Sequence, residues 1–89
     1  MNDKYITVSQ LSRYLKFKFD QDPNLGQVFL KGEISNFKAH TRGHYYFTIK
    51  DEGSRINAVM FASQVSKLNF IPEDGMKIMA IGRVSVYEA

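Results

Sequence analysis

The sequence has 89 residues, which is room for one domain with a single modest core. Its content of 44% hydrophobic and 13% aromatic residues excludes disorder, and the absence of cysteine excludes disulfides, thiolate metal sites and thiol catalysis. The net charge of +3 permits a polyanionic partner, while the lack of a long apolar run or signal peptide predicts a cytoplasmic domain without membrane contact.

A helix is predicted near the amino terminus. Thr7 at the N-cap can accept a hydrogen bond from the amide of Gln10, whose side chain can reach back to the Thr7 amide. An apolar stripe then recurs at helical spacing, formed by Leu11, Tyr14, Leu15 and Phe19. The helix is expected to end near Phe19 or Asp20, before a turn rich in Asp, Pro and Gly.

The alternation of apolar and polar residues after this turn predicts four strands. They are expected at residues 27–35, 44–50, 55–61 and 76–86, with a short helix at residues 62–70 between the third and the fourth. Gly32 is expected to mark a bulge or sharp bend, and Gly82 to lie in the middle of the fourth strand. Alternation predicts an inward set of Tyr45, Phe47, Ile49, Ile56, Ala58 and Met60 and an outward set of His44, Tyr46, Thr48, Lys50, Asn57, Val59 and Phe61.

This order of elements predicts a mainly β domain, an oligonucleotide-binding (OB) barrel. Such a barrel has five strands, of which the fifth closes between the third and the fourth. Only four strands are predicted over residues 1–89, so we expect the chain to be a single-stranded nucleic-acid-binding domain cut from a longer protein. Because open sheet edges promote aggregation, we also expect the third or fourth strand to pair with another copy or to be covered.

The stretch from Asn36 to Lys50 holds the candidate binding residues. It contains no carboxylate but has three fixed cations, two histidines and four aromatic residues. A basic loop next to a strand rich in aromatic rings suits single-stranded nucleic acid, because phosphates and base faces alternate along such a strand. The alternative is that the rings of this stretch form the core and that the loop is merely solvated.

The candidate DNA-binding residues divide by role. Flat surfaces for bases are expected from His44, Tyr46 and Phe61, and phosphate contacts from Lys31, Lys38, Arg42, Lys50, Arg55 and Arg83. The loop between the first two β-strands is expected to be mobile and to bring His40, Lys38 and Arg42 to the bound nucleic acid. Phe37 would either stack on a base or pin the base of this loop to the barrel, and Phe61 would be either exposed or packed under the short helix.

No catalytic or metal site is predicted. The acidic pairs Asp51-Glu52 and Glu73-Asp74 lie in turns, where adjacent side chains point apart. His40 and His44 lie four residues apart in a loop that contains glycine, and the sequence offers no evident third ligand. The chain is therefore expected to be a binding module without a cofactor.

Several motifs resemble those of one known family. The runs 7–11, 31–37, 43–48, 58–61, 72–76 and 82–89 are similar, in order and spacing, to the amino-terminal domain of the exodeoxyribonuclease VII large subunit family. The resemblance implies an OB-fold domain that binds single-stranded DNA for a nuclease that degrades such DNA to oligonucleotides. It also implies that the catalytic region and the region that recruits small subunits lie beyond Ala89.

Two other functions remain open from the sequence. One is an OB domain that binds RNA, as at the anticodon-binding end of some tRNA synthetases. The other is an assembly module whose outward aromatic side chains are buried against another protein. A comparison of affinities for DNA and RNA of one sequence separates the first alternative from DNA binding, and aromatic rings buried in a symmetric interface would favour the second.

Overall fold

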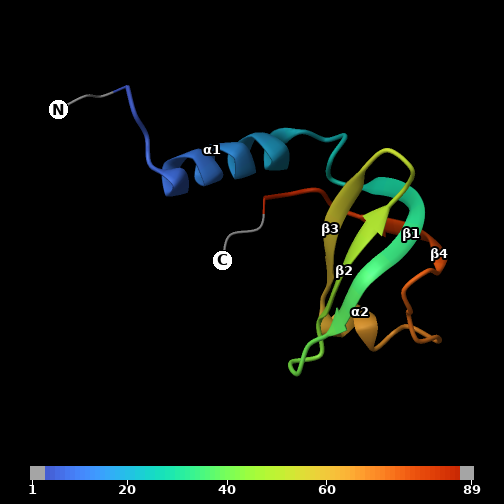
Figure 1. Cartoon of the computed structure of the whole chain (residues 1–89). Helices are drawn as coiled ribbons and strands as arrows, with labels where there is room; N and C mark the ends of the chain where they lie inside the picture. The colour runs from blue at the N-terminus through green and yellow to red at the C-terminus, as the bar shows by residue number, and fades with distance from the viewer. Residues whose placement is uncertain (1–3, 87–89) are drawn as a thin grey trace. The chain divides into compact units, whose positions relative to one another are not determined.

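The computed structural model describes residues 4–86 (Figure 1). The elements are α1 (Val8–Gln21), β1 (Val28–Ala39), β2 (Tyr45–Lys50), β3 (Arg55–Met60), α2 (Ala62–Val65) and β4 (Lys77–Gly82). The chain divides into two compact units, with boundaries after Phe29 and after Ala80. We call Leu30–Ala80 the sheet unit and the remaining described residues the helix unit. The last three residues of the predicted 82–89 motif lie outside the described residues.

The helix unit contains α1, which begins at the predicted cap. The Thr7 hydroxyl accepts a hydrogen bond from the Gln10 amide at 3.0 Å, and the Gln10 side chain accepts one from the Thr7 amide at 2.8 Å. This reciprocal pair satisfies two amides that the first turn leaves without helical partners. The helix ends at Gln21, one residue later than predicted. Within the apolar stripe, Phe19 is half-buried and the other three side chains are exposed.

The four strands form one open antiparallel sheet in the order β3-β2-β1-β4, and α2 lies between β3 and β4 in the sequence (Figure 1). The mainly β architecture with an amino-terminal helix is therefore confirmed. β3 and β4 form the two edges, as expected for an OB barrel that lacks the strand between them. That one of these edges pairs with another copy, or is covered by terminal residues, stays a prediction.

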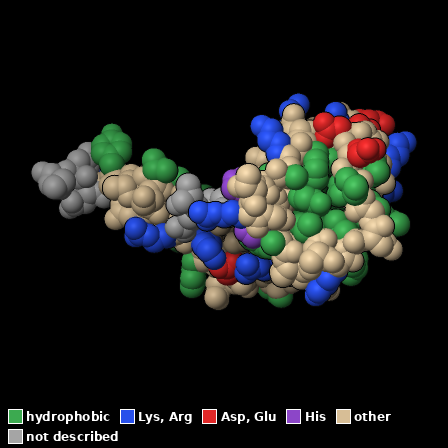
Figure 2. All heavy atoms as spheres, turned by 90° about the horizontal axis from the view of Figure 1, so that it is seen from below, with side chains coloured by type: hydrophobic (Ala, Val, Ile, Leu, Met, Phe, Trp, Pro, Cys, Tyr) green, Lys and Arg blue, Asp and Glu red, His purple; other side chains and the backbone are tan. Residues whose placement is uncertain are grey.

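The core of the sheet unit centres on one pair of isoleucines. Ile34 of β1 lies opposite Ile49 of β2, and their exposed fractions are 2% and 7%. The predicted inward residues of β2 and β3 share this face, in the pairs Tyr45 with Met60, Phe47 with Ala58 and Ile49 with Ile56. Figure 2 shows hydrophobic side chains gathered on the part of the molecule that carries the strands, with Lys and Arg side chains at its margins.

Two side chains depart from the predicted burial. Ile56, expected to be inward, is 43% exposed, because it lies in the edge strand β3. Thr48, expected to be outward, is buried, and its hydroxyl lies 3.4 Å from the amide oxygen of Asn57, its cross-strand partner. Thr48 is a short residue in a central strand, so the neighbouring strands shield it from solvent even on the outer face.

Element lengths also differ from the prediction. β4 ends at Gly82, which is therefore not in the middle of the strand. The helix predicted at residues 62–70 is a single turn, α2, in which the Ser66 hydroxyl donates to the carbonyl of Ser63 at 2.9 Å. Such serine-to-backbone bonds compete with helix propagation. β1, in contrast, runs to Ala39 and is longer than predicted.

Candidate nucleic-acid interface

A β-bulge in β1 decides which side chains face the outer surface of the sheet. Ser35 lies opposite Thr48, but Lys38 lies opposite Tyr46, so the register shifts between Ser35 and Lys38 and two residues face one. The first of the two, Asn36, has φ +52° in the left-handed region, which asparagine tolerates better than most residues. Because side chains alternate along a strand, the extra residue moves every following side chain to the other face.

The bulge places Phe37 and Lys38 on opposite faces. The Phe37 ring packs edge-on against Tyr45, with centroids 4.8 Å apart, and lies 6.4 Å from the ring of Phe47. These contacts support the second of its two predicted roles, in which Phe37 packs against the sheet, while stacking of Phe37 on a base stays a prediction. Lys38 shares the outer face with Tyr46. It belongs to β1, so the expectation that a mobile loop carries it is also wrong.

Asp74 holds the bulge in place, a role that the sequence analysis did not find. Its carboxylate accepts a hydrogen bond from the Phe37 amide at 2.9 Å, although the two residues are 37 positions apart. The adjacent Gly75 amide donates to the carbonyl of Ile34 at 2.8 Å, which fixes the turn beside β1. The local sequence signal for the bulge is Asn36, because asparagine is one of the few residue types that tolerate the left-handed region.

We expect Asp74→Ala to destabilise the fold by about 1 kcal/mol, the usual net value of a hydrogen bond. For a domain of this size this free energy corresponds to a fall of about 4–8 °C in the midpoint of thermal unfolding. The matched control is Glu73→Ala, which removes a neighbouring exposed carboxylate from the same turn. Equal unfolding midpoints for the two variants, measured by circular dichroism, would show that the carboxylate does not support the bulge.

The connection between β1 and β2 is a short turn closed by hydrogen bonds. The His40 amide donates to the carbonyl of His44 at 2.8 Å, and the Gly43 amide donates to the carbonyl of His40 at 2.9 Å. The Arg42 amide donates to Nδ1 of His40 at 3.2 Å. The mobile loop predicted from Asn36 onward is thus replaced by continued strand pairing and a closed turn, because the bulge lets β1 stay in register with β2.

Two aromatic pairs lie where β2 begins and β3 ends, opposite the hairpin that joins these strands. The rings of His40 and Tyr46 are 5.8 Å apart at 72°, and those of His44 and Phe61 are 5.3 Å apart at 89°. Phe61 is 52% exposed, so the alternative that it packs under α2 is wrong. Tyr46 lies opposite Val59, and Phe61 follows Val59 by two residues, so Tyr46 and Phe61 are diagonal neighbours. In both pairs the rings are arranged edge to face.

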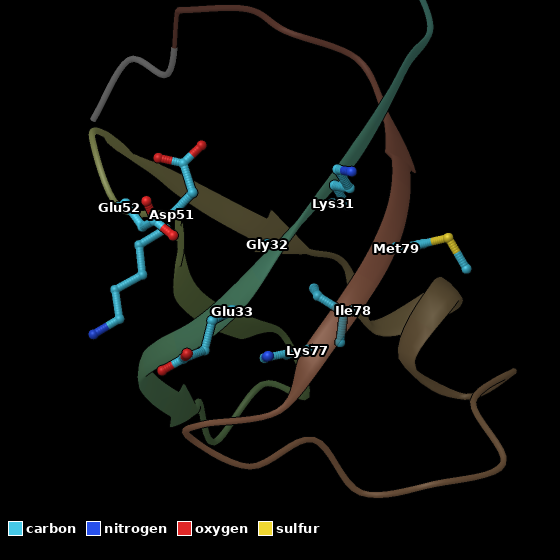
Figure 3. A pocket seen from close by; sticks show the side chains of 9 residues that line it. Lys31, Gly32, Glu33, Asp51, Glu52, Lys77, Ile78 and Met79 are labelled. Atoms are coloured by element: carbon cyan, nitrogen blue, oxygen red, sulfur yellow. The ribbon is translucent and has the colours of Figure 1, made fainter.

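Lys31 lies in a groove at the other end of the sheet (Figure 3), and Lys50 lines the same groove. The groove is lined by Lys31, Gly32, Glu33, Lys50, Asp51, Glu52, Lys77, Ile78 and Met79. Its lining contains three lysines and three carboxylates, so the groove carries no net charge. Arg55 lies opposite Lys50 across β2 and β3, at the same end of the sheet. These three cations therefore lie beside carboxylates that line the same groove or its end of the sheet, whereas Arg42 lies in a turn, residues 40–44, that contains no acidic residue.

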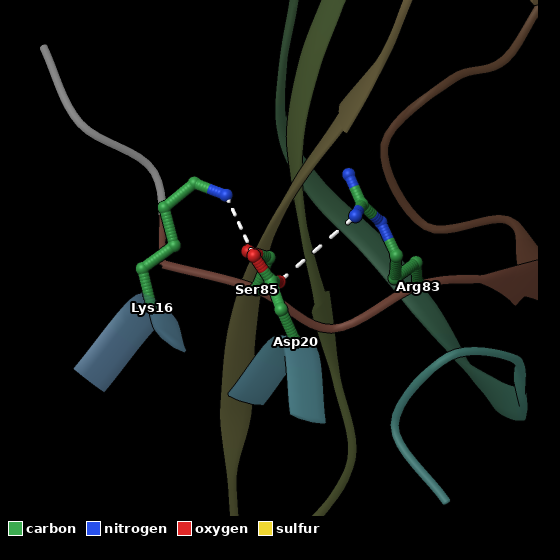
Figure 4. Close-up of polar contacts among 4 residues, drawn as sticks. All are labelled: Lys16, Asp20, Arg83 and Ser85. Carbon is green, nitrogen blue, oxygen red and sulfur yellow. Dashed lines mark hydrogen bonds and ion pairs between the residues drawn. The ribbon is translucent and has the colours of Figure 1, made fainter. Parts of the chain in front are cut away.

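Arg83 belongs to the helix unit and already has an acidic partner there (Figure 4). Its guanidinium lies 3.9 Å from a carboxylate oxygen of Asp20, to which the Ser85 hydroxyl also donates at 3.2 Å. The Lys16 ammonium donates to the other oxygen at 2.9 Å. The hydrogen bond from Lys16, with smaller contributions from Ser85 and Arg83, lowers the pKa of Asp20 despite some desolvation. The structure thus does not group Arg83 with the residues of the sheet unit.

Within residues 4–86, no three side chains of His, Asp or Glu come together as a metal-binding group. The same residues include no helix long and apolar enough to cross a membrane. What the sheet unit does present is an aromatic surface at the end of β2 and β3, next to Lys38 and Arg42.

Comparison with known proteins agrees with this geometry. The model of the family described as OB-fold nucleic acid binding domain matches residues 6–89. The whole chain is 58% identical to the exodeoxyribonuclease 7 large subunit of Bacillus cytotoxicus and 57% identical to those of Bacillus thuringiensis and Bacillus mycoides. It spans 20% of the length of each of these relatives. On the match to its family model and on its fold, the chain belongs to the OB-fold nucleic acid binding domains.

Proposed function

We propose that this domain binds single-stranded DNA, with little preference for sequence, as part of an exodeoxyribonuclease large subunit. The observation that carries the proposal is the exposed Phe61 ring beside Tyr46 on the outer face of the sheet. Aromatic rings of this kind stack on any base, because every base has a π-face. Lys38 opposite Tyr46 and Arg42 in the adjoining turn supply the positive charge that the phosphates require.

The proposal extends to the parent protein. A protein with this domain would degrade single-stranded DNA to oligonucleotides in the cytoplasm, as part of DNA catabolism. Its catalytic residues and its contacts with a small subunit would lie outside these 89 residues, and this chain would need no cofactor. Pairing of β3 or β4 with another copy belongs to the same proposal, because both are edge strands.

A titration with fluorescent oligonucleotides tests the proposal. We expect the full chain to bind a 16-nucleotide oligothymidylate more tightly than a duplex of equal length, measured by fluorescence anisotropy. About four phosphate contacts would weaken binding roughly 50-fold between 50 and 200 mM salt, because each contact contributes about −0.7 to the log–log slope for single strands. Equal affinity at both salt concentrations or a preference for duplex would contradict the proposal, and tighter binding to RNA of the same sequence would favour the RNA-binding alternative.

Arg42→Ala should flatten the salt dependence by about 0.7 in the log–log slope, because one phosphate contact is lost. Arg42 is exposed at the tip of the turn, so the substitution leaves the sheet unchanged. The control is Arg13→Ala, which removes the same charge from α1. A slope that falls equally in both variants would show that total charge, and not the position of Arg42, sets the affinity.

A further inference from the structure

His44 bonds to the backbone at the point where β3 passes into α2. Its Nδ1 accepts a hydrogen bond from the Ala62 amide at 2.9 Å, 18 residues away in the sequence. Phe61, the N-cap residue of α2, has no side chain that can accept this bond, so His44 satisfies an amide that α2 leaves free. The His44 ring also contacts the Phe61 ring edge-on, with centroids 5.3 Å apart.

Little room is left at this junction. A Cβ added to Gly43, which has φ +93°, would lie 3.2 Å from Cβ of Ala62. The turn before β2 and the start of α2 are therefore in close contact, and the bond from Ala62 to His44 joins them. Phe61 lies in the sequence between the end of β3 and Ala62. The hydrogen bond from the Ala62 amide therefore restrains the backbone on one side of Phe61, and the His44 ring restrains the Phe61 side chain.

We propose that His44 is a positioning residue for Phe61 in binding single-stranded DNA, and that it acts only as the neutral imidazole. This inference rests on the proposed function. An imidazole Nδ1 accepts a hydrogen bond only when the proton is on Nε2, whereas the imidazolium has a proton on both nitrogens and accepts none. Protonation therefore breaks the bond to Ala62 and releases Phe61 from the orientation in which its exposed face meets a base.

The segments around His44 offer no acidic group that could bond to the protonated ring in place of the lost bond to Ala62. Its own turn contains His40 and the cationic Arg42, and β2 adds the neutral Tyr46. The end of β3 and α2 contain no charged residue from Ile56 to Ser66, and Lys67 is the first that follows. These segments offer no carboxylate to accept the new N–H of the imidazolium.

Acidification should weaken the binding of DNA, which is the opposite of what added positive charge alone would do. Histidine is the side chain that changes charge between about pH 5 and 8. If His44 only added positive charge near a phosphate, acidification would tighten the binding of DNA. If His44 positions Phe61, acidification weakens it, by about fivefold for one lost hydrogen bond of about 1 kcal/mol.

The experiment isolates His44 by replacing the other histidine of the chain. In the His40→Asn background His44 is the only histidine, because the sequence contains two. Affinity for oligothymidylate is measured at pH 7.5 and pH 5.5 at constant ionic strength, with and without His44→Asn. The Oδ1 of asparagine takes the place of Nδ1 as acceptor and never titrates. We expect the loss of affinity at pH 5.5 to be about fivefold greater with His44 than with asparagine, whereas equal pH profiles or tighter binding at pH 5.5 would overturn the inference.

A double-mutant cycle at pH 7.5 tests whether the effect passes through Phe61. His44→Ala should weaken binding about fivefold when Phe61 is present and should have no effect when Phe61 is already alanine. Equal effects in both backgrounds would overturn the positioning role, and thermal unfolding of each variant confirms that the compared proteins are folded. Absence of any binding by the unsubstituted chain would instead contradict the proposed function itself.

Discussion

Replacing both Tyr46 and Phe61 by alanine should reduce the affinity for oligothymidylate by at least about 30-fold. Each stacked base is worth about 1–3 kcal/mol, and 1.4 kcal/mol corresponds to a tenfold change in affinity. Phe61 is 52% exposed and therefore loses little packing when it is truncated, so the effect should appear in binding more than in stability. Fluorescence anisotropy at low salt measures the affinity, and circular dichroism confirms the fold.

The matched control is Phe70→Ala. Phe70 is 48% exposed, belongs to the same unit and is not among the proposed DNA contacts, so its truncation removes a similar fraction of exposed aromatic surface without removing one of them. We expect this variant to bind as tightly as the unsubstituted chain. Tyr46→Phe provides the second control, because it keeps the stacking ring and loses only the hydroxyl. Equal losses of affinity for Phe70→Ala and Phe61→Ala would place the binding surface elsewhere.

The faces of β2 and β3 could be predicted from the sequence because alternation is a local property. Tyr45, Phe47 and Ile49 share one face with their partners on β3, and Tyr46 shares the other face with Val59. Both strands are regular and joined by a tight hairpin, in which Asp51 accepts hydrogen bonds from two amides of its own turn. Nothing distant in the sequence is needed to set this register.

The outer face of β1 could not be predicted in the same way. Strict alternation from Ile34 assigns Lys38 to the inner face, and only a bulge reverses this assignment. The bulge depends on the bond from the Phe37 amide to Asp74, a contact that no local pattern encodes. The residues that alternation identified correctly are therefore those whose register is local, and Lys38 was proposed as a DNA contact for the wrong structural reason.

The contacts of the two histidines were missed for a related reason. Both were proposed as surfaces or charges for DNA, but each uses Nδ1 to accept a backbone amide, from Arg42 for His40 and from Ala62 for His44. The first partner lies within a tight turn and the second across two elements. Residue type alone indicates that a histidine can stack, donate or accept, and only the fold determines which of these it does.

Gly32→Ala should be strongly destabilising. A Cβ at this position would lie 2.6 Å from Cγ2 of Ile49 and 2.8 Å from the backbone carbonyl oxygen of Lys50. The register of β1 with β2 begins at Glu33, so the predicted bulge or sharp bend at Gly32 stays a prediction. What the structure shows is that the glycine allows β1 and β2 to approach closely. Because a backbone oxygen cannot rotate away, the strands must separate, at a cost of about 1–3 kcal/mol, the range for overpacked cores. For a domain of this size each kcal/mol lowers the unfolding midpoint by about 4–8 °C.

Gly53→Ala is the control, because a Cβ there meets nothing within 4 Å and the position lies in the neighbouring hairpin turn. It should leave the unfolding midpoint unchanged, and equal midpoints for the two variants would show that β1 can shift to accommodate the added Cβ without loss of stability.

The separation caused by Gly32→Ala acts on Ile49 at the centre of the core and on the pairing of Glu33 with Lys50. The turn end of β2, with Tyr46, is held separately by the bulge and its bond to Asp74. Below the unfolding transition, Gly32→Ala should therefore keep most of its affinity for oligothymidylate, which separates stability at one end of the sheet from recognition at the other.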